Sequence, residues 1–507
     1  MIELLKCLQS KKCIRWSLSI TLFLLLVFSF CFERVPRADG AGWDGILYRD
    51  MMQNFLQQFK NGGYSEYYTQ KCLPFAIINI VDTLFGIKNS FFTLICFEFV
   101  CIALAVWAFF KISNYLSLNK KSEIIAFALL FFTHATLRIG YDPYQGDPFA
   151  YTIGMWIFYF FLTKQHWKML GITFVGAFVW QSLVPITLLL FILPQEGYNL
   201  VDGKNVSTKY AKVLKIVKIL LSILVIMIPA KMFSRAELSR GGWENYERMV
   251  PYYFWDMPIW VVFATIVTIC LIVYFLLQPF SFNIKDFVLF VFKKMVWWKW
   301  LVAFVFYFVI KCFIRSIANT EISASGNENL SFIHRIFYEP FMIPLKFCAS
   351  HLANEGMLIC LLVLCYKEVV RYASEHSVGY VAALMMTILF GLQTESRFVL
   401  NFFPFVAFPI AKKLSEIQLK KWVPLLACSV QLFLSAFWFK QNTPTLGQAL
   451  AIDNDRAYQI GEAQRCLYSN GPWMGPKAYF IFLFLFVVIM AFLYIGRKNN
   501  WYVEKDI

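Results

Sequence analysis

Four long stretches of the 507-residue chain are almost free of charged side chains and restrict its fold more than any other feature. They cover residues 16–32, 91–110, 259–277 and 479–495, and Glu98 is the only charged residue in them. A helix of about 20 residues spans the roughly 30 Å hydrocarbon core of a bilayer. Because these stretches are continuously apolar, whereas the strands of a membrane barrel alternate, we predict helices that cross a membrane.

The composition agrees with a single integral membrane domain over residues 1–507. Hydrophobic residues make up 59% of the chain and charged residues 15%, which is more apolar surface than a soluble core can bury. The net charge of +16 comes from Lys and Arg clusters between the apolar stretches, so we expect membrane lipids and not nucleic acid as its partners. The 13 cysteines form no C-x-x-C pair and no cluster with metal-ligand spacing, so no metal site is predicted.

The basic clusters set the predicted topology, because loops rich in Lys and Arg stay in the cytoplasm. Both termini are then cytoplasmic, but residues 169–193 look like one span with basic loops on both sides. We therefore predict a broken hairpin that turns back near residues 180–182, and a helix on the outer surface over residues 73–85. This gives an all-α polytopic protein of about fourteen crossings, with about eleven as the lower bound.

Polar chemistry is expected in the extracytoplasmic loops, which include residues 33–89 and 441–476. In the first of these loops, Asp39 and Asp44 lie among glycines and aromatic residues, close after the first span. A carboxylate in a partly desolvated pocket can have a raised pKa and accept a proton from an attacking hydroxyl group. The alternative is a solvated loop without a catalytic role.

The absence of eukaryotic targeting signals points to a bacterial inner membrane.

Two motifs in this loop resemble those of the GT-C superfamily of glycosyltransferases, which use polyprenyl-phosphate-linked sugars as donors. Residues 43–48, WDGILY, resemble the W-D-x-x-x-Y motif, and residues 72–75, CLPF, resemble the Leu-Pro segment that follows it. The resemblance implies that Asp44 is the general base, with Asp39 as the alternative. It also implies that Tyr48 belongs to the substrate-binding region.

A second acidic turn extends the resemblance. The family places a Glu/Asp-Pro-hydrophobic motif at the outer start of its fourth helix, and Asp147-Pro148-Phe149 is similar to it. Asp142 and Asp147 would then bind substrate, although Asp147 followed by a proline is equally typical of a helix N-terminus. Many family members carry Lys or Arg at the bend between two short outer helices, where this chain has Gln181. The resemblance therefore assigns Gln181 to substrate binding, and the donor phosphate must find its cation elsewhere.

Four basic residues in the middle of the chain are candidates for that cation. Lys311 and Arg315 lie four residues apart, on one helical face near the predicted outer end of a span. Charges near bilayer depth are costly, and such a pair suits a lipid phosphate, or it extends its side chains to the headgroups. His334 and Arg335 in the next loop are further candidates.

A late segment supplies one more arginine. Residues 394–404, TESRFVLNFFP, resemble the Arg-aromatic stretch, followed by a proline, that opens a late helix in these transferases. The resemblance implies that Arg397 faces the donor phosphate or sugar from outside. The alternatives are an ion pair with Glu395 or an anchor in the membrane interface.

The function expected from these residues is transfer of a sugar from a polyprenyl-phosphate donor to a glycan, lipid or protein at the extracytoplasmic face. No cofactor is assigned, and assistance by a divalent metal is left open. One alternative is a polysaccharide polymerase or ligase, which relies on outer-loop arginines. A non-enzymatic flippase or transporter is another, but such proteins usually have repeated halves and polar residues near mid-membrane. Here most charged residues lie near the ends of the apolar stretches.

Overall fold

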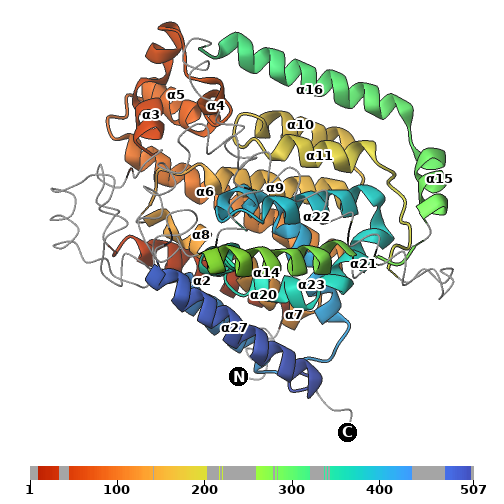
Figure 1. Ribbon diagram of the computed structural model, residues 1–507. Coiled ribbons are helices and arrows are strands. Elements are labelled where there is room, and N and C mark those ends of the chain that lie inside the picture. Colours follow the sequence, from red (N-terminus) through yellow and green to blue (C-terminus); the bar gives the residue numbers. More distant parts are fainter. Residues whose placement is uncertain are drawn as a thin grey trace.

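The computed structural model of the chain is helical throughout the part that it describes (Figure 1). That part comprises residues 10–32, 45–140, 142–201, 258–277, 280–282, 284–319, 343–436 and 476–503, with residues 41, 216, 220, 336, 340 and 474 standing alone. Within it, the only β-type pairing is one isolated bridge between Leu419 and Val503. The prediction of an all-α chain is confirmed for these residues.

The first half of the chain contains α2 (Lys11–Ser29), α3 (Gly45–Lys60), α4 (Glu66–Thr69), α5 (Leu73–Phe85), α6 (Ser90–Tyr115), α7 (Lys120–Phe131), α8 (His134–Leu137), η1 (Arg138–Gly140), α9 (Asp147–Leu162), α10 (His166–Gly176) and α11 (Leu183–Ile192). The second half contains α14 (Pro258–Leu277), α15 (Ile284–Lys294), α16 (Trp297–Ile317), α19 (Lys346–Glu355), α20 (Leu358–Leu364), α21 (Tyr366–His376), α22 (Val378–Phe390), η3 (Ser396–Phe398), η4 (Leu400–Phe402), α23 (Pro404–Ser415), α24 (Val423–Ser435) and α27 (Pro476–Lys498).

Four of the described helices are long and apolar enough to cross a membrane: α2, α6, α16 and α27. A fifth crossing results if α7 and the α8–η1 segment, which are bent by 61° relative to each other, count as one broken span. Other apolar helices, such as α5 and α22, have 13 residues each and are therefore only about 20 Å long. The long apolar helices support the membrane-protein class, and the larger number of crossings from the charge pattern stays a prediction.

The helices pack as a bundle with an outlying group at one end (Figure 1). Helices α3, α4 and α5 gather at the upper left of the view, whereas α15 lies at the right-hand edge. Helix α16 runs along the top beside the pair α10 and α11, and α27 runs along the bottom against α19 and α20. Helices α6 and α9 cross the centre of the bundle and pack against each other.

The segment predicted to form a broken hairpin contains two helices that pack side by side. Helix α10 ends at Gly176 and α11 begins at Leu183, with residues 177–182 forming the turn between them. A Cβ atom on Gly176 would lie 3.0 Å from Leu183 Cδ1, so the missing side chain lets the second helix fold back closely. On which side of a membrane this turn lies stays a prediction.

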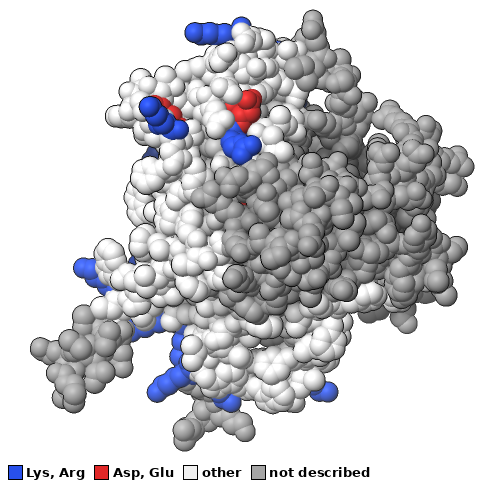
Figure 2. Space-filling model, turned by 90° about the vertical axis from the view of Figure 1, so that its left-hand side faces the viewer, with Lys and Arg blue, Asp and Glu red and all other residues white. Residues whose placement is uncertain are grey.

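Much of the described surface is apolar, as expected of a protein that lipid surrounds. On α16, Leu301 is 65% exposed and Phe304 is 68% exposed, although both are large hydrophobic residues. Soluble proteins rarely leave so much contiguous apolar surface uncovered. On the face drawn in Figure 2, the described charged side chains form small groups in the upper part and along the lower part, and most of the remaining described surface is uncharged.

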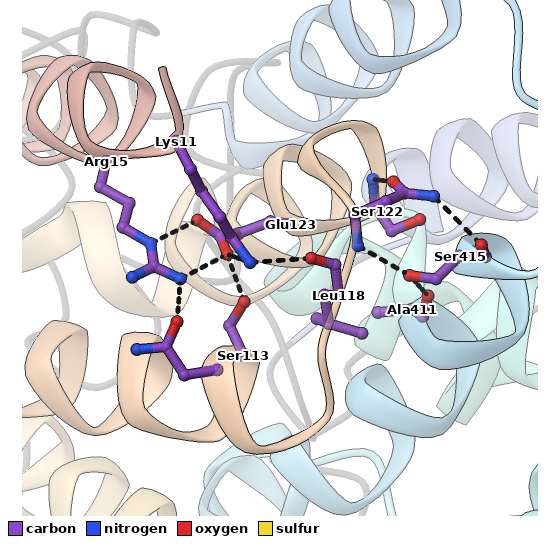
Figure 3. A network of polar contacts seen from close by, with 10 residues as sticks. Lys11, Arg15, Ser113, Leu118, Ser122, Glu123, Ala411 and Ser415 are labelled. Carbon is purple, nitrogen blue, oxygen red and sulfur yellow. Dashed lines mark hydrogen bonds and ion pairs between the residues drawn. The ribbon is translucent and has the colours of Figure 1, made fainter.

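A buried carboxylate joins three helices at another place in the bundle (Figure 3). Glu123 in the first turn of α7 has a side chain with no solvent exposure. Its Oε1 accepts a hydrogen bond from Arg15 Nε at 2.7 Å, and its Oε2 accepts bonds from Arg15 Nη2 at 2.8 Å and from the Ser113 hydroxyl. Lys11 Nζ lies 3.2 Å from Oε2. These contacts fix α2 and α6 to the start of α7.

Candidate functional site

Asp147 is the residue around which a site can be built, because two arginines from distant parts of the chain converge on it. It lies in the first turn of α9, where the helix dipole favours a carboxylate, and it is only 2% exposed. Arg138 Nη2 in η1 donates a hydrogen bond to Oδ2, and Arg397 Nε in η3 donates one to Oδ1 at 3.2 Å. Asp147 opens α9 after the N-cap Gly146 and is followed by Pro148, so the helix N-terminus expected from the sequence is present together with the two arginines.

Trp180, in the turn between α10 and α11, lies beside this ion-pair network. The Arg397 guanidinium carbon is 5.2 Å from the centroid of the indole ring, and Lys71 Nζ is 4.9 Å from the same centroid. Both distances fall within the range of cation–π attraction. Because both distances are measured from the same centroid, the Arg397 guanidinium carbon and Lys71 Nζ are no more than about 10 Å apart. The aromatic ring thus connects a lysine from the first loop to an arginine from the late helical segment.

Two hydrogen bonds fix the positions of these segments relative to one another. Leu73 N donates to Phe178 O at 3.0 Å, which fixes the start of α5 to the turn that carries Trp180. Ser182 Oγ donates to Phe398 O at 3.2 Å, which fixes the same turn to η3. The positions of Lys71, Trp180 and Arg397 therefore depend on contacts between segments that are far apart in the sequence.

Lys71 is a residue that the sequence analysis missed. Its side chain is buried, 3% exposed, and its ammonium group donates a hydrogen bond to the Tyr67 hydroxyl and lies 3.8 Å from the centroid of the Tyr67 ring. Burying the charge of a lysine costs free energy unless polar groups or aromatic rings interact with the ammonium group. The signal available in the sequence was its place two residues before Leu73 of the Leu-Pro segment.

Several polar groups near these cations have no protein partner among the described residues. Trp180 Nε1 and Gln181 Nε2 are buried without a hydrogen-bond acceptor, and both carboxyl oxygens of Glu355 are buried without a donor. Glu355 belongs to α19, and this helix packs against η3, which carries Arg397, and against α8, which directly precedes Arg138. Buried polar groups are nearly always satisfied in folded proteins, so such a concentration is typical of a place that binds a ligand or water.

The start of α3 also contacts the turn that precedes Asp147. A Cβ atom on Gly45 would lie 3.0 Å from Tyr144 Cβ, so the first residue of α3 packs directly against this turn. A Cβ atom on Gly146 would lie 3.5 Å from Pro74 Cγ, which brings the Leu-Pro segment to the same turn. Gly45 and Pro74, one residue from each of the two predicted motifs, are therefore neighbours of the acidic turn.

Of the remaining predicted substrate residues, Asp142 lies beside the network and Tyr48 lies in the core of the first loop. Asp142 Oδ2 is 3.9 Å from Arg138 Nη1, and its Oδ1 accepts a hydrogen bond from Gln145 Nε2 at 3.1 Å. Tyr48 is 1% exposed and stacks on Phe75 with ring centroids 4.5 Å apart. This packing joins α3 to α5.

The predicted phosphate-binding cations on α16 are more exposed than Arg397. Lys311 Nζ forms an ion pair with Glu66 Oε1 of α4 at 2.7 Å, and both side chains are about a quarter exposed. An exposed pair of this kind contributes about 1 kcal/mol or less to stability. Arg315, one turn further along α16, has an exposed side chain. Asp39, Asp44, His334 and Arg335 lie outside the described residues.

The described residues offer no thiol nucleophile at this site and no cluster of His, Cys, Asp and Glu that could hold a metal ion. Cys72 lies next to Lys71, but burial raises the pKa of its thiol to about 12, so the thiol stays protonated near neutral pH. The chemistry that the residues allow is electrostatic: cations to hold an anion, and carboxylates to orient those cations. Comparison with protein-family models, with curated proteins and with solved structures found no match to this chain.

Proposed function

We propose that this protein is a GT-C-like glycosyltransferase that moves a sugar from a polyprenyl-phosphate donor to a glycan, lipid or protein acceptor. In this proposal it crosses a bacterial inner membrane about fourteen times, with cytoplasmic termini and its site at the extracytoplasmic face. The proposal begins from the sequence motifs around Asp44, Asp147 and Arg397. The contact between Asp147 and Arg397 supports it.

The observation that carries the proposal is the convergence of Asp147, Arg397, Trp180 and Lys71. Arg397 contacts both the Asp147 carboxylate and the Trp180 ring, and Lys71 contacts the same ring. A lipid-linked phosphate binds best to cations that are partly buried and already held in position. A carboxylate that bonds to an arginine holds the guanidinium group in this way. The contact of Gly45 with Tyr144 adds that the residue following Asp44 belongs to the same neighbourhood.

The proposed reaction is a single displacement at the anomeric carbon. The acceptor hydroxyl gives its proton to the Asp44 carboxylate while its oxygen forms the new bond to the anomeric carbon. The bond from that carbon to the phosphate oxygen breaks, and polyprenyl phosphate leaves with the electron pair. Arg397 and Lys71 stabilise the charge on the phosphate, and Asp147 acts as a positioning residue for Arg397. One displacement inverts the anomeric configuration.

The test is transfer of radiolabelled sugar in membranes that contain equal amounts of wild-type protein or Asp44→Asn. A panel of polyprenyl-phosphate sugars serves as donors, and Glu416→Gln, which changes an exposed acid paired with Lys413, serves as the matched control. Loss of a general base is expected to lower the rate by about 10²- to 10⁴-fold, with the control unchanged.

Each other outcome has a distinct meaning. Transfer that Asp44→Asn leaves intact would move the base to Asp39 or Asp147. Transfer only from oligosaccharide-linked lipids would favour a polymerase or ligase, and the network of Arg138 and Arg397 suits that chemistry as well. No transfer from any donor would contradict the proposal and favour a transport function.

A further inference from the structure

An apolar groove lies between α2 and α6, two of the helices long enough to cross a membrane. Its volume is about 480 Å³, and its walls include Leu22 and Leu26 of α2 and Phe99, Ile102 and Ala103 of α6. Phe91 at the start of α6 packs against Tyr144, beside the candidate site. Lys111 lies 20 residues further along α6, about 30 Å away. The groove runs toward this second end.

The end of the groove that is remote from Asp147 is rich in positive charge. Lys12 and Arg15 line the groove directly. Lys111 Nζ lies 5.1 Å from the ring centroid of Trp107, another lining residue. No acidic side chain lines the groove in the part of the chain that the structure describes.

Glu123 is a carboxylate at this end of the helices, and other residues of the chain already bind it (Figure 3). Arg15 and Ser113 bond to its oxygens, and Lys11 adds an ion pair. Lys12 and Lys111 have no ion-pair partner among the described residues. Two positive charges at this end therefore have no negative counterpart among the residues that the structure describes, while the groove walls beside them are apolar.

We propose that this groove binds an anionic phospholipid, with an acyl chain between α2 and α6 and the phosphate at Lys12 and Lys111. A zwitterionic lipid or a protein helix fills apolar space equally well, but neither supplies the net negative charge that would pair with Lys12 and Lys111. Attraction between a basic side chain and an anionic lipid surface corresponds to about a fivefold gain in affinity per cation. The positive-inside rule predicts that this end is cytoplasmic, where anionic lipids are abundant. The site is independent of the proposed transferase activity.

The experiment is native mass spectrometry of the full chain purified in a neutral detergent. It measures the affinity for phosphatidylglycerol against phosphatidylcholine and polyprenyl phosphate. Wild type is expected to bind phosphatidylglycerol about 25-fold more tightly than phosphatidylcholine with the same chains, a factor of about five for each of the two lysines. Lys12→Gln combined with Lys111→Gln should remove most of this preference, whereas Lys413→Gln, at an exposed pair, should leave it unchanged.

A second pair of variants tests the groove itself. Ala103→Trp places an indole in the space for the acyl chain and should abolish the tight phosphatidylglycerol adduct. Val100→Trp puts the same side chain on a 56% exposed position of α6 that does not line the groove, and should bind as wild type does. Equal affinity for both phospholipids, a preference for polyprenyl phosphate, or an adduct that survives Ala103→Trp would overturn the proposal. Size-exclusion profiles confirm that each variant is folded.

Discussion

Two buried carboxylates, Glu123 and Asp147, are each held by two cations, yet their surroundings differ. Glu123 has no exposure, and both of its oxygens are bonded to helices that pack around it. Asp147 is nearly as buried, but its partner Arg397 also reaches Trp180, whose Nε1 has no hydrogen-bond acceptor among the described residues.

The difference separates a structural clamp from a site. A closed network satisfies every polar group within the protein, so its value lies in holding helices together. A buried donor without an acceptor lowers the free energy of unfolding. Such donors occur mainly at functional sites, where a ligand supplies the missing acceptor. On this reasoning Glu123 serves stability and Asp147 serves binding, and substitutions at the two networks test the distinction.

The largest effect on stability is expected from Glu123→Gln. It removes the negative charge between Lys11 and Arg15 and leaves two cations without compensation, which should lower the free energy of unfolding by about 3 kcal/mol. Thermal unfolding of the purified protein measures this, with Glu416→Gln as the control at a half-exposed pair. Glu123→Gln with the thermal stability of wild type would show that this network is not a clamp.

A smaller loss of stability, but a large loss of activity, is expected from Arg397→Gln. Arg138 still neutralises Asp147, so the fold should persist, whereas loss of a cation at the donor phosphate should lower transfer by about 10²-fold. The measurement is kcat/KM for the donor on folded protein. Arg497→Gln, which breaks an exposed pair with Glu368, is the matched control. Equal activity of the two variants would remove Arg397 from the site.

The smallest effect is expected from Trp180→Phe. Phenylalanine keeps an aromatic ring but weakens the attraction to Arg397 and Lys71 by about 0.5–1 kcal/mol and removes the Nε1 donor. The KM for the donor should rise about threefold while kcat stays near that of wild type. Trp156→Phe, at a half-buried tryptophan of α9, controls for lost packing. A rise in KM for both variants would mean that packing alone is responsible.

Part of the candidate site followed from sequence motifs and part did not. Asp147 and Arg397 were singled out separately, each from the residues beside it in the chain, and the structure joins them across 250 positions. Arg138 and Lys71 were not singled out, because neither stands in a motif that the sequence analysis used. Lys311 was predicted as a phosphate ligand, and in the structure its partner is Glu66.

The all-helical, membrane-type architecture follows from the amino-acid sequence alone, because a long apolar stretch is a local property and its backbone groups must hydrogen-bond within a helix when lipid surrounds it. The pairing of charged side chains, in contrast, follows from the tertiary structure. The partners of Asp147 come from η1 and η3, and the partners of Glu123 come from α2 and α6. Such pairs depend on how helices pack in three dimensions, and neither hydropathy nor residue spacing carries that information.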